Sequence, residues 1–345
     1  MDLGLAQNLV KYGIIEEFFD YQGLDDEIVN KYKYFEQKFE LLFADKAIQY
    51  KLKDCYFYIS NKFYCNAFAR SKKGYNIIGI TSGYVIKMLD IFNEKYFSSL
   101  ILIALINDVN ILNAYADLCS MKYFDISDFM LNCSIQFTFG HEFQHILQFN
   151  SSTITIDYYE SENFDEADFD IQKHAWEFDA DRFASFEVLK YVFEIKRRFK
   201  VINDEVFLCM MYLGLSSIVI TKIFFYFKIK DSVSPIGKVD FYTKKYLHPH
   251  PVVRILNIIE YFFENVKDSF VDLRIDIQGF LNNVLGISKI YFDSYLPKSK
   301  IMDEILLDLH MYLDEINKYN VELYDYAVNN KAIRDMLIKR GINFD

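Results

Sequence analysis

The sequence predicts an α+β protein that is mostly helical and carries one small sheet. Glycine (12) and proline (4) are scarce in 345 residues, so tight turns are few and long helices are favoured. Aromatic and β-branched residues gather at strand-like spacing only in residues 54–81. Elsewhere the apolar residues recur at helical spacing, which indicates helices on both sides of this region.

The first third of the chain contains the predicted sheet. Residues 1–50 alternate charged and aromatic positions at helical spacing and predict one or two amphipathic helices. Three strands are expected at 55–59, 66–69 and 76–81, and Lys72-Lys73-Gly74 suits a hairpin turn between the last two. Helices are expected to resume at about Ser82.

The rest of the chain is expected to be helical with two loops. The apolar run 98–106 is too short to span a membrane, so we expect it to lie in the hydrophobic core. Asp125 or Ser127 suits the N-cap of a buried helix that continues toward Gln148. Further predicted segments are helices at 171–198 and 206–227, an acidic loop at 157–170, a loop at 231–238, a helix that starts at His248-Pro249-His250-Pro251, and amphipathic helices over the last 80 residues.

We expect three sequence regions in one compact arrangement. They are an N-terminal helical segment (1–53), a core that carries the chemistry (54–260) and a C-terminal helical extension (261–345). Residues 206–221 are uncharged and are followed by Lys222 and IFFYF. This segment is long enough to span a bilayer only if Lys222 is tolerated there, so a buried core helix is favoured over a membrane span.

Charge and cysteine content exclude several classes of function. The net charge of −11 is the reverse of the basic field of a nucleic-acid binder, and it disfavours binding to an anionic membrane. The five cysteines include no CxxC pair, which disfavours a disulfide framework or a cysteine zinc site. The N-terminal residues lack the pattern of a secretory signal, and we expect a protein of the reducing cytoplasm.

The strongest chemical signal is His141-Glu142-Phe143-Gln144-His145. Residues four apart lie on the same helix face, so both imidazoles can reach one metal ion. Glu142 lies at the edge of that face, where it can take a proton from the attacking water. Apolar neighbours on both sides suit a buried helix, whereas two histidines at this spacing by coincidence is the alternative.

A catalytic zinc site needs a third protein ligand, and Glu177 in the helix predicted at 171–198 is the best candidate. His174, three residues earlier, could compete for the metal. Asp181 follows Glu177 by one turn and could orient a ligand histidine through its outer N–H.

A later segment, His248-Pro249-His250-Pro251-Val252-Val253-Arg254, offers further polar groups. His248 or Arg254 could donate a hydrogen bond to a developing oxyanion. Arg254 could instead pair with Asp181 and lock the ligand helix. A proline-capped helix start with a structural arginine explains the segment equally well.

Together these residues resemble the gluzincin zinc peptidases, in which HExxH is followed by ExxxD, here HEFQH and EFDAD. Asn66-Ala67-Phe68-Ala69 and Ile80-Thr81-Ser82-Gly83 resemble a strand pair of the HtpX and CaaX-prenyl-protease families, and His248-Pro249…Arg254 resembles their HPxxxxR element. The pieces occur in the families' order over residues 60–260. Those families carry clear transmembrane helices, whereas this chain has at most one doubtful span. That difference and the HPHP doublet at 248–251 make the chain more similar to the phage-exclusion peptidase Lit family.

The resemblance implies a zincin-like fold with the sheet beside the HExxH helix, and a zinc endopeptidase that hydrolyses peptide bonds. It also implies that a sheet edge, formed by 66–69 or 76–81, pairs with the extended substrate. Lit-type enzymes act inside the cell on elongation factor Tu during phage infection, so a translation factor is the implied substrate and antiviral defence the implied role.

Two other functions stay open at this stage. One is a membrane-associated, HtpX-like housekeeping peptidase, and the other is a non-enzymatic sensor that keeps the fold. Because an unregulated cytoplasmic peptidase would harm its host, we also expect an activating protein or peptide. The helices of 261–345 are candidates for binding it, although plain scaffold explains them equally well.

Overall fold

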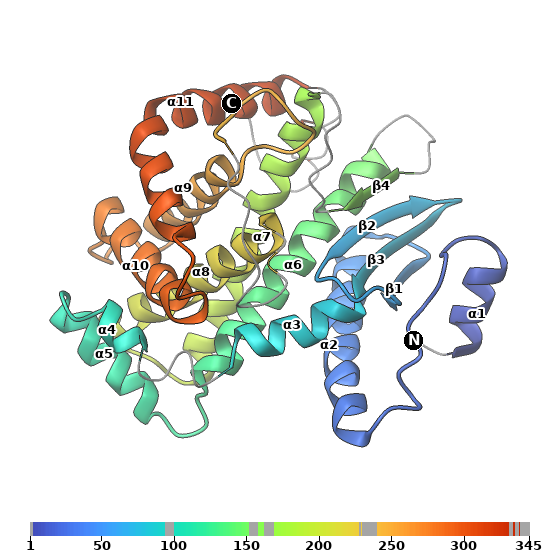
Figure 1. Cartoon of the computed structure of the whole chain (residues 1–345), viewed down its shortest axis with the longest axis horizontal. Coiled ribbons are helices and arrows are strands. Elements are labelled where there is room, and N and C mark those ends of the chain that lie inside the picture. The colour runs from blue at the N-terminus through green and yellow to red at the C-terminus, as the bar shows by residue number, and fades with distance from the viewer. Residues whose placement is uncertain are drawn as a thin grey trace. The chain divides into compact units, whose positions relative to one another are not determined.

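The computed structural model describes residues 3–93, 100–151, 158–161, 169–227, 229, 240–330, 334 and 338. The chain is mostly helical with one four-stranded mixed sheet, in agreement with the predicted α+β class (Figure 1). It divides into two compact units, and this division does not coincide with the three expected segments. Unit 1 contains 1–90, 138–163 and 327–345, and unit 2 contains 91–137 and 164–326.

Unit 1 contains the sheet and the helices that cover it. Its complete elements are α1 (Leu3–Lys11), α2 (Asp26–Tyr50), β1 (Cys55–Ser60), β2 (Ala67–Lys72), β3 (Tyr75–Thr81) and β4 (Tyr158–Ser161). Helices α3 (Ser82–Ile91), α6 (Ile126–Ser151) and α11 (Ile301–Asn329) each run from one unit into the other. The three predicted strands and the helix start at Ser82 are therefore confirmed.

The sheet has the order β1-β3-β2-β4. β1 runs parallel to β3, whereas β2 is antiparallel to both β3 and β4. The predicted hairpin joins β2 to β3 through Lys73 and Gly74, whose φ angles are 51° and 85°. Positive φ at both central residues is the requirement of the type I′ two-residue turn, which matches the twist of the strands, and glycine meets it without strain.

The expectation of a substrate-binding edge at 66–69 or 76–81 is wrong. β3 lies between β1 and β2, and β2 pairs with β4 from Phe68 to Ser71. The outer strands of the described sheet are β1 and β4. The physical reason is that residues 158–161, expected as part of an acidic loop, form strand β4, which pairs with the side of β2 that faces away from β3. The rest of that acidic stretch, apart from 169 and 170, and the loop at 231–238 lie outside the described residues.

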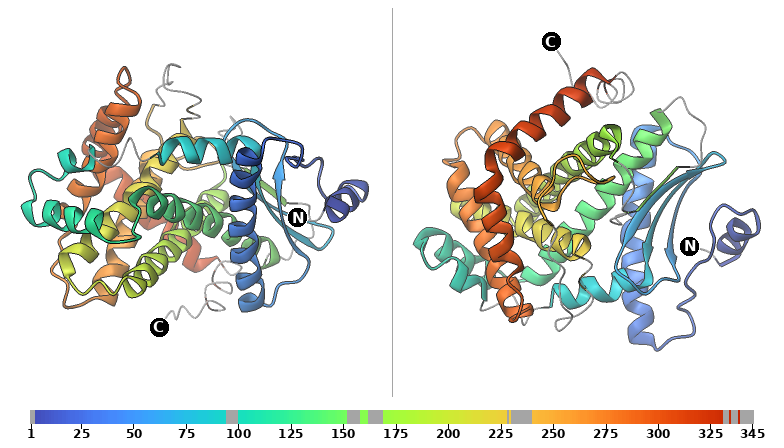
Figure 2. Two further views of the ribbon diagram at one scale, coloured as in Figure 1. Left: turned by 90° about the horizontal axis from the view of Figure 1, so that it is seen from below. Right: turned by 45° about the horizontal axis from the view of Figure 1, so that its top comes forward.

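Helices cover both faces of the sheet in unit 1 (Figure 2). On one face, Phe39 of α2 stacks on Phe57 of β1 at 4.8 Å between ring centroids, and Phe139 of α6 contacts Phe39 at 6.1 Å. On the other face, Leu9 of α1 shares a small core with Phe68 of β2. The C-terminal part of α6, which carries the HExxH motif, is thus anchored on α2 by aromatic packing.

The loop before β2 is fastened to the start of α3. The carbonyl of Lys62 accepts hydrogen bonds from the Gly83 amide (3.0 Å) and from the Ser82 hydroxyl (2.9 Å). A Cβ atom at position 83 would lie 2.1 Å from the Phe63 carbonyl oxygen, so only glycine permits this close approach. This contact supplies a physical reason for glycine at the end of the Ile80-Thr81-Ser82-Gly83 segment.

Unit 2 is all helical in its described part. Its complete helices are α4 (Leu100–Ala104), α5 (Val109–Ser120), α7 (Ile171–Arg198), α8 (Asp204–Tyr226), α9 (Pro251–Ser269) and α10 (Ile277–Tyr295). α8 packs against α5, α7, α9 and α10. Among the described helices it alone has the length and composition of a membrane span, and 94% of its apolar window is buried within the protein.

Most helix ends follow the predicted signals. The Asp125 side chain accepts a hydrogen bond from the Asp128 amide at 2.7 Å, which confirms it as the cap of α6. α7 has the predicted bounds, and α9 begins at Pro251 with His250 as its N-cap. The prediction that 98–106 is core can be examined at residues 100–106, since 98 and 99 lie outside the described residues. It is only half right, because Ile101 is buried whereas Leu102, Ile103 and Ile106 are exposed.

Candidate metal centre

Helix α6 carries both predicted histidine ligands on one buried face. His141 and His145 are each 1% exposed, and their Nε2 atoms lie 3.1 Å apart. Two nitrogens bound at about 2.1 Å to one tetrahedral ion are separated by roughly 3.4 Å, so the observed spacing is close to that of shared coordination. Glu142, the next residue, is also buried, at 2% exposure.

Gln148 fixes the orientation of His145. The Nδ1–H of His145 donates to Gln148 Oε1 at 2.7 Å, which leaves Nε2 as the nitrogen that faces His141. An outer hydrogen bond of this kind selects the tautomer of a metal-binding histidine. Asp181, the residue expected in this role, instead binds Arg254. The available signal was the spacing of Gln148, three residues after His145 and therefore on the same helix face.

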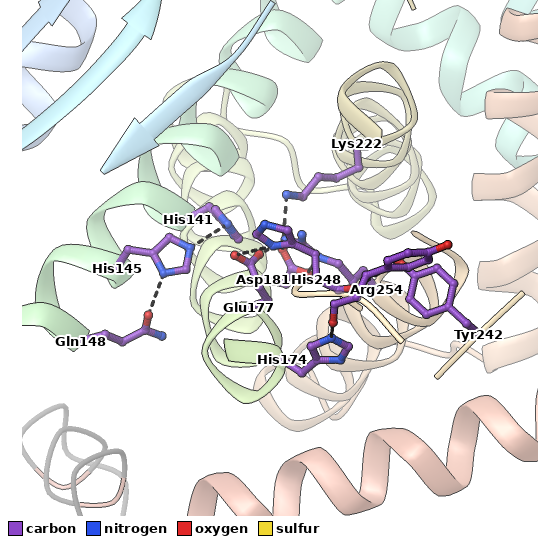
Figure 3. A network of polar contacts seen from close by, with 11 residues as sticks. His141, His145, Gln148, His174, Glu177, Asp181, Lys222, Tyr242, His248 and Arg254 are labelled. Atoms are coloured by element: carbon purple, nitrogen blue, oxygen red, sulfur yellow. Dashed lines mark hydrogen bonds and ion pairs between the residues drawn. The ribbon is translucent and has the colours of Figure 1, made fainter. Parts of the chain in front are cut away.

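Helix α7 presents the two predicted carboxylates, and Arg254 of α9 clamps both of them (Figure 3). Arg254 Nε and Nη2 donate to the two Asp181 oxygens at 2.6 and 2.7 Å, and Nη2 also lies 2.7 Å from Glu177 Oε2. All three residues are 3% exposed or less. Of the two roles expected for Arg254, the structure therefore has the pairing with Asp181, which fixes the helix that carries Glu177.

Lys222 of α8 is a member of the same network that the sequence reasoning missed. Its Nζ lies 3.5 Å from Asp181 Oδ1, and its side chain is 1% exposed. Phe137 and Tyr226 each place a ring 5.2 Å from Nζ. Two buried cations thus offset two buried carboxylates, which limits the cost of removing the four charges from water. In the sequence, Lys222 is informative only as a charge that disfavours a membrane span.

The three remaining histidines of the motifs have different surroundings. His248 Nδ1 lies 3.3 Å from Glu177 Oε1, beside the candidate ligand carboxylate (Figure 3). His250 Nδ1 accepts the Val252 amide at 3.2 Å and so caps α9.

His174 uses both ring nitrogens, because Nε2 lies 2.6 Å from the Tyr246 carbonyl oxygen and Nδ1 lies 2.7 Å from the Tyr319 hydroxyl. It is therefore not available as a competing ligand. Its burial lowers its pKa to about 4, and the hydrogen bond to Tyr246 offsets part of this effect.

His141, His145 and Glu177 together form a group that can hold a metal ion. One ligand atom from each residue lies within 4.8 Å of the other two, and all three residues are buried. Within the described part of the chain this is the one such group of three or more histidine, cysteine or acidic residues. The predicted set of three ligands is therefore brought together, and its two imidazoles and one carboxylate are donors that suit zinc.

The predicted substrate-binding residues have structural contacts of their own. The Asn66 amide donates to Thr81 Oγ1 at 3.0 Å, and its carbonyl accepts the Thr81 amide. Ala67, Phe68 and Ala69 are buried in β2. The Phe68 ring lies over Gly79, where a Cβ would be 2.3 Å from it.

A comparison of the chain with protein families, with curated proteins and with solved structures found no match. The functional argument therefore depends on the residues and their geometry.

Proposed function

We propose that this protein is a zinc-dependent peptidase with a zincin-like site, in which His141, His145 and Glu177 hold the metal and Glu142 is the general base. The observation that carries the proposal is the convergence of two imidazoles and one carboxylate within 4.8 Å. An acidic residue directly after the first histidine adds the proton acceptor that hydrolysis requires.

The ligand set leaves room for chemistry. Three protein ligands leave one position of a tetrahedral ion open, as in catalytic zinc sites, whereas structural sites are closed by four. When bound there, a zinc ion would acidify the attacking water and polarise the scissile carbonyl.

The side chains of this chain perform the remaining tasks. Glu142 takes the proton from the attacking water and later delivers it to the leaving amine. His145 keeps Nε2 directed inward because Gln148 holds its Nδ1. Arg254 binds Glu177 Oε2, so that oxygen is held while the carboxylate retains lone pairs for a metal.

His248 is the better candidate for stabilising the oxyanion. Two of the three guanidinium nitrogens of Arg254 already bind Asp181, which gives Arg254 a positioning role. His248 lies beside Glu177 without such a commitment to a second carboxylate.

For the substrate we propose an intracellular protein, with elongation factor Tu as the first one to examine. Support comes from the resemblance of the HPHP doublet at 248–251 to the Lit family and from the burial of α8, the helix that an HtpX-like membrane peptidase would place in the bilayer. A cytoplasmic defence peptidase with a protein or peptide activator is the corresponding biological role.

The first experiment measures zinc by elemental analysis after purification without chelators. We expect about one zinc per chain in the wild type and in Glu142→Gln, and much less in Glu177→Ala. Glu187→Ala, a change of a buried glutamate in the same helix, is the matched control and should keep its zinc. A wild type without zinc would rule out the proposal.

The second experiment tests the chemistry. Purified elongation factor Tu and unfolded casein are incubated with wild type and with Glu142→Gln, and fragments are identified by mass spectrometry. Cleavage by the wild type alone supports a peptidase. Full zinc content with no cleavage of either substrate, even with phage-infected cell extract added as a source of activator, would favour the non-enzymatic sensor.

A further inference from the structure

A pocket of about 310 Å³ lies in unit 1 on the α1-facing side of the sheet. None of the residues that line it belongs to the candidate metal centre. Its volume is within the range of roughly 300–1,000 Å³ that is usual for small-molecule sites. The chain after α1 forms one wall and is joined to the sheet by a hydrogen bond from the Phe19 amide to the Ile59 carbonyl (2.8 Å).

The middle of the pocket is aromatic. Tyr58 of β1 and Phe68 of β2 both pair with Gly79 of β3, so they form one row across the sheet. Their rings contact each other at 5.6 Å in an edge-to-face arrangement. This row provides an apolar wall between two polar ends.

One end of the pocket is positively charged. Lys62 is half-buried there, and its ammonium makes no ion pair or hydrogen bond with the described residues. Beside it, Ser60 is 2% exposed and its hydroxyl has no hydrogen-bond partner among the described residues. A buried hydroxyl without a partner is costly, and a bound acceptor would satisfy it.

The opposite end is negatively charged. The exposed residues Glu16 and Glu17 line the pocket here, together with the basic residue Arg70. Arg70 Nη1 is 3.9 Å from Glu16 Oε1, and the glutamate side chain is 75% exposed. Two carboxylates and one guanidinium line this part of the pocket, so their net charge is negative.

The register separates the two ends along the sheet. Arg70 pairs with Ile77 of β3, and Ser60 pairs with Thr81, four positions further along the same strand. At about 3.3 Å per residue, this separation is about 13 Å between backbones, which long side chains from both ends shorten. A ligand that fits must carry opposite charges at its two ends and an apolar group between them.

We propose that this pocket binds a short peptide of about two residues with free termini. Its carboxylate lies against Lys62 and Ser60, its ammonium lies against Glu16 and Glu17, and an apolar side chain packs on the aromatic row. This inference does not depend on the peptidase proposal.

Calorimetric titration with the dipeptide alanyl-phenylalanine tests it. We expect saturable binding to the wild-type protein, and binding at least tenfold weaker for both the N-acetylated and the C-amidated dipeptide. Lys62→Gln should weaken binding of the free dipeptide at least tenfold. It should not weaken binding of the C-amidated dipeptide any further, because amidation has already removed the carboxylate that Lys62 would pair with. Lys33→Gln, an exposed lysine of α2, is the matched control and should bind as the wild type does.

The same titrations distinguish this pocket from the metal centre. Glu177→Ala should bind the dipeptide normally, and Glu17→Gln should weaken it. The proposal is overturned if no saturable binding occurs at millimolar dipeptide. It is equally overturned if Glu177→Ala abolishes binding while Lys62→Gln, shown to be folded by circular dichroism, leaves it unchanged.

Discussion

Acid should destabilise this protein through His174. The side chain is fully buried, and its two nitrogens are satisfied in the neutral form, with Nε2–H donating to the Tyr246 carbonyl and Nδ1 accepting from the Tyr319 hydroxyl. Burial lowers its pKa to about 4 in the folded protein. In the unfolded chain the value is about 6.5.

The sign and size of the effect follow from these two values. Between pH 6.5 and 4 the unfolded chain binds a proton that the folded protein does not, so the free energy of unfolding falls as the pH falls. The contribution is fully present above pH 6.5. For pKa values of 4 and 6.5, the loss between pH 7 and pH 5 is about 2 kcal/mol.

Urea unfolding at pH 7 and pH 5 measures this loss. Both buffers contain EDTA, so that proton competition at metal ligands does not contribute. We expect the wild type to lose about 2 kcal/mol more than His174→Gln between the two pH values. His310→Gln, which changes an exposed histidine, should respond as the wild type does. Equal losses in the wild type and in His174→Gln would refute the reasoning.

Three further predictions concern the buried charges, the loop contact and the metal. Arg254→Ala leaves two buried carboxylates without their clamp and should lower the free energy of unfolding by about 3–5 kcal/mol in urea titrations; a loss below 1 kcal/mol would contradict the network. Gly83→Ala should destabilise by roughly 1–3 kcal/mol, because its Cβ would meet the Phe63 carbonyl at 2.1 Å, whereas Gly286→Ala in the open interior of α10 should be neutral or stabilising. EDTA should lower the melting temperature of zinc-replete protein and added zinc should restore it, and an unchanged transition would argue against a bound metal.

The buried charge network explains why α8 contains a lysine. A lysine within a buried apolar helix must pair with an opposite charge or extend its ammonium to water, because an unpaired buried charge is costly. Lys222 finds Asp181, which already accepts two hydrogen bonds from Arg254. Asp181, the aspartate of the ExxxD pattern, therefore links α7 to α8 through Lys222 and to α9 through Arg254 within unit 2. These contacts hold the part of α7 that carries Glu177, one turn away.

Much of this protein's structure could be predicted from the sequence by rules that act over a few neighbouring residues. The i, i+4 spacing of His141 and His145 places them on one helix face whatever surrounds the helix. Asp125 and Pro251 mark helix starts because capping and the fixed φ of proline act within a few residues. The β2–β3 turn follows from the positive φ that Gly74 permits. These features could be predicted because their causes lie within one turn or one hairpin.

Tertiary structure decided the features whose cause is a contact between distant segments. The acidic stretch 157–170 as a whole favours a loop, and within it pairing with β2 makes residues 158–161 a strand. The same pairing removes the free edge that we expected at β2. The polar groups that bind the side chains of Asp181 and His174 come from 41 to 145 residues away in sequence, so hydrogen-bond geometry and burial, rather than spacing, select them. Burial also shifts the pKa of His174, because the cost of charging an imidazole depends on the atoms around it and not on its neighbours in the chain.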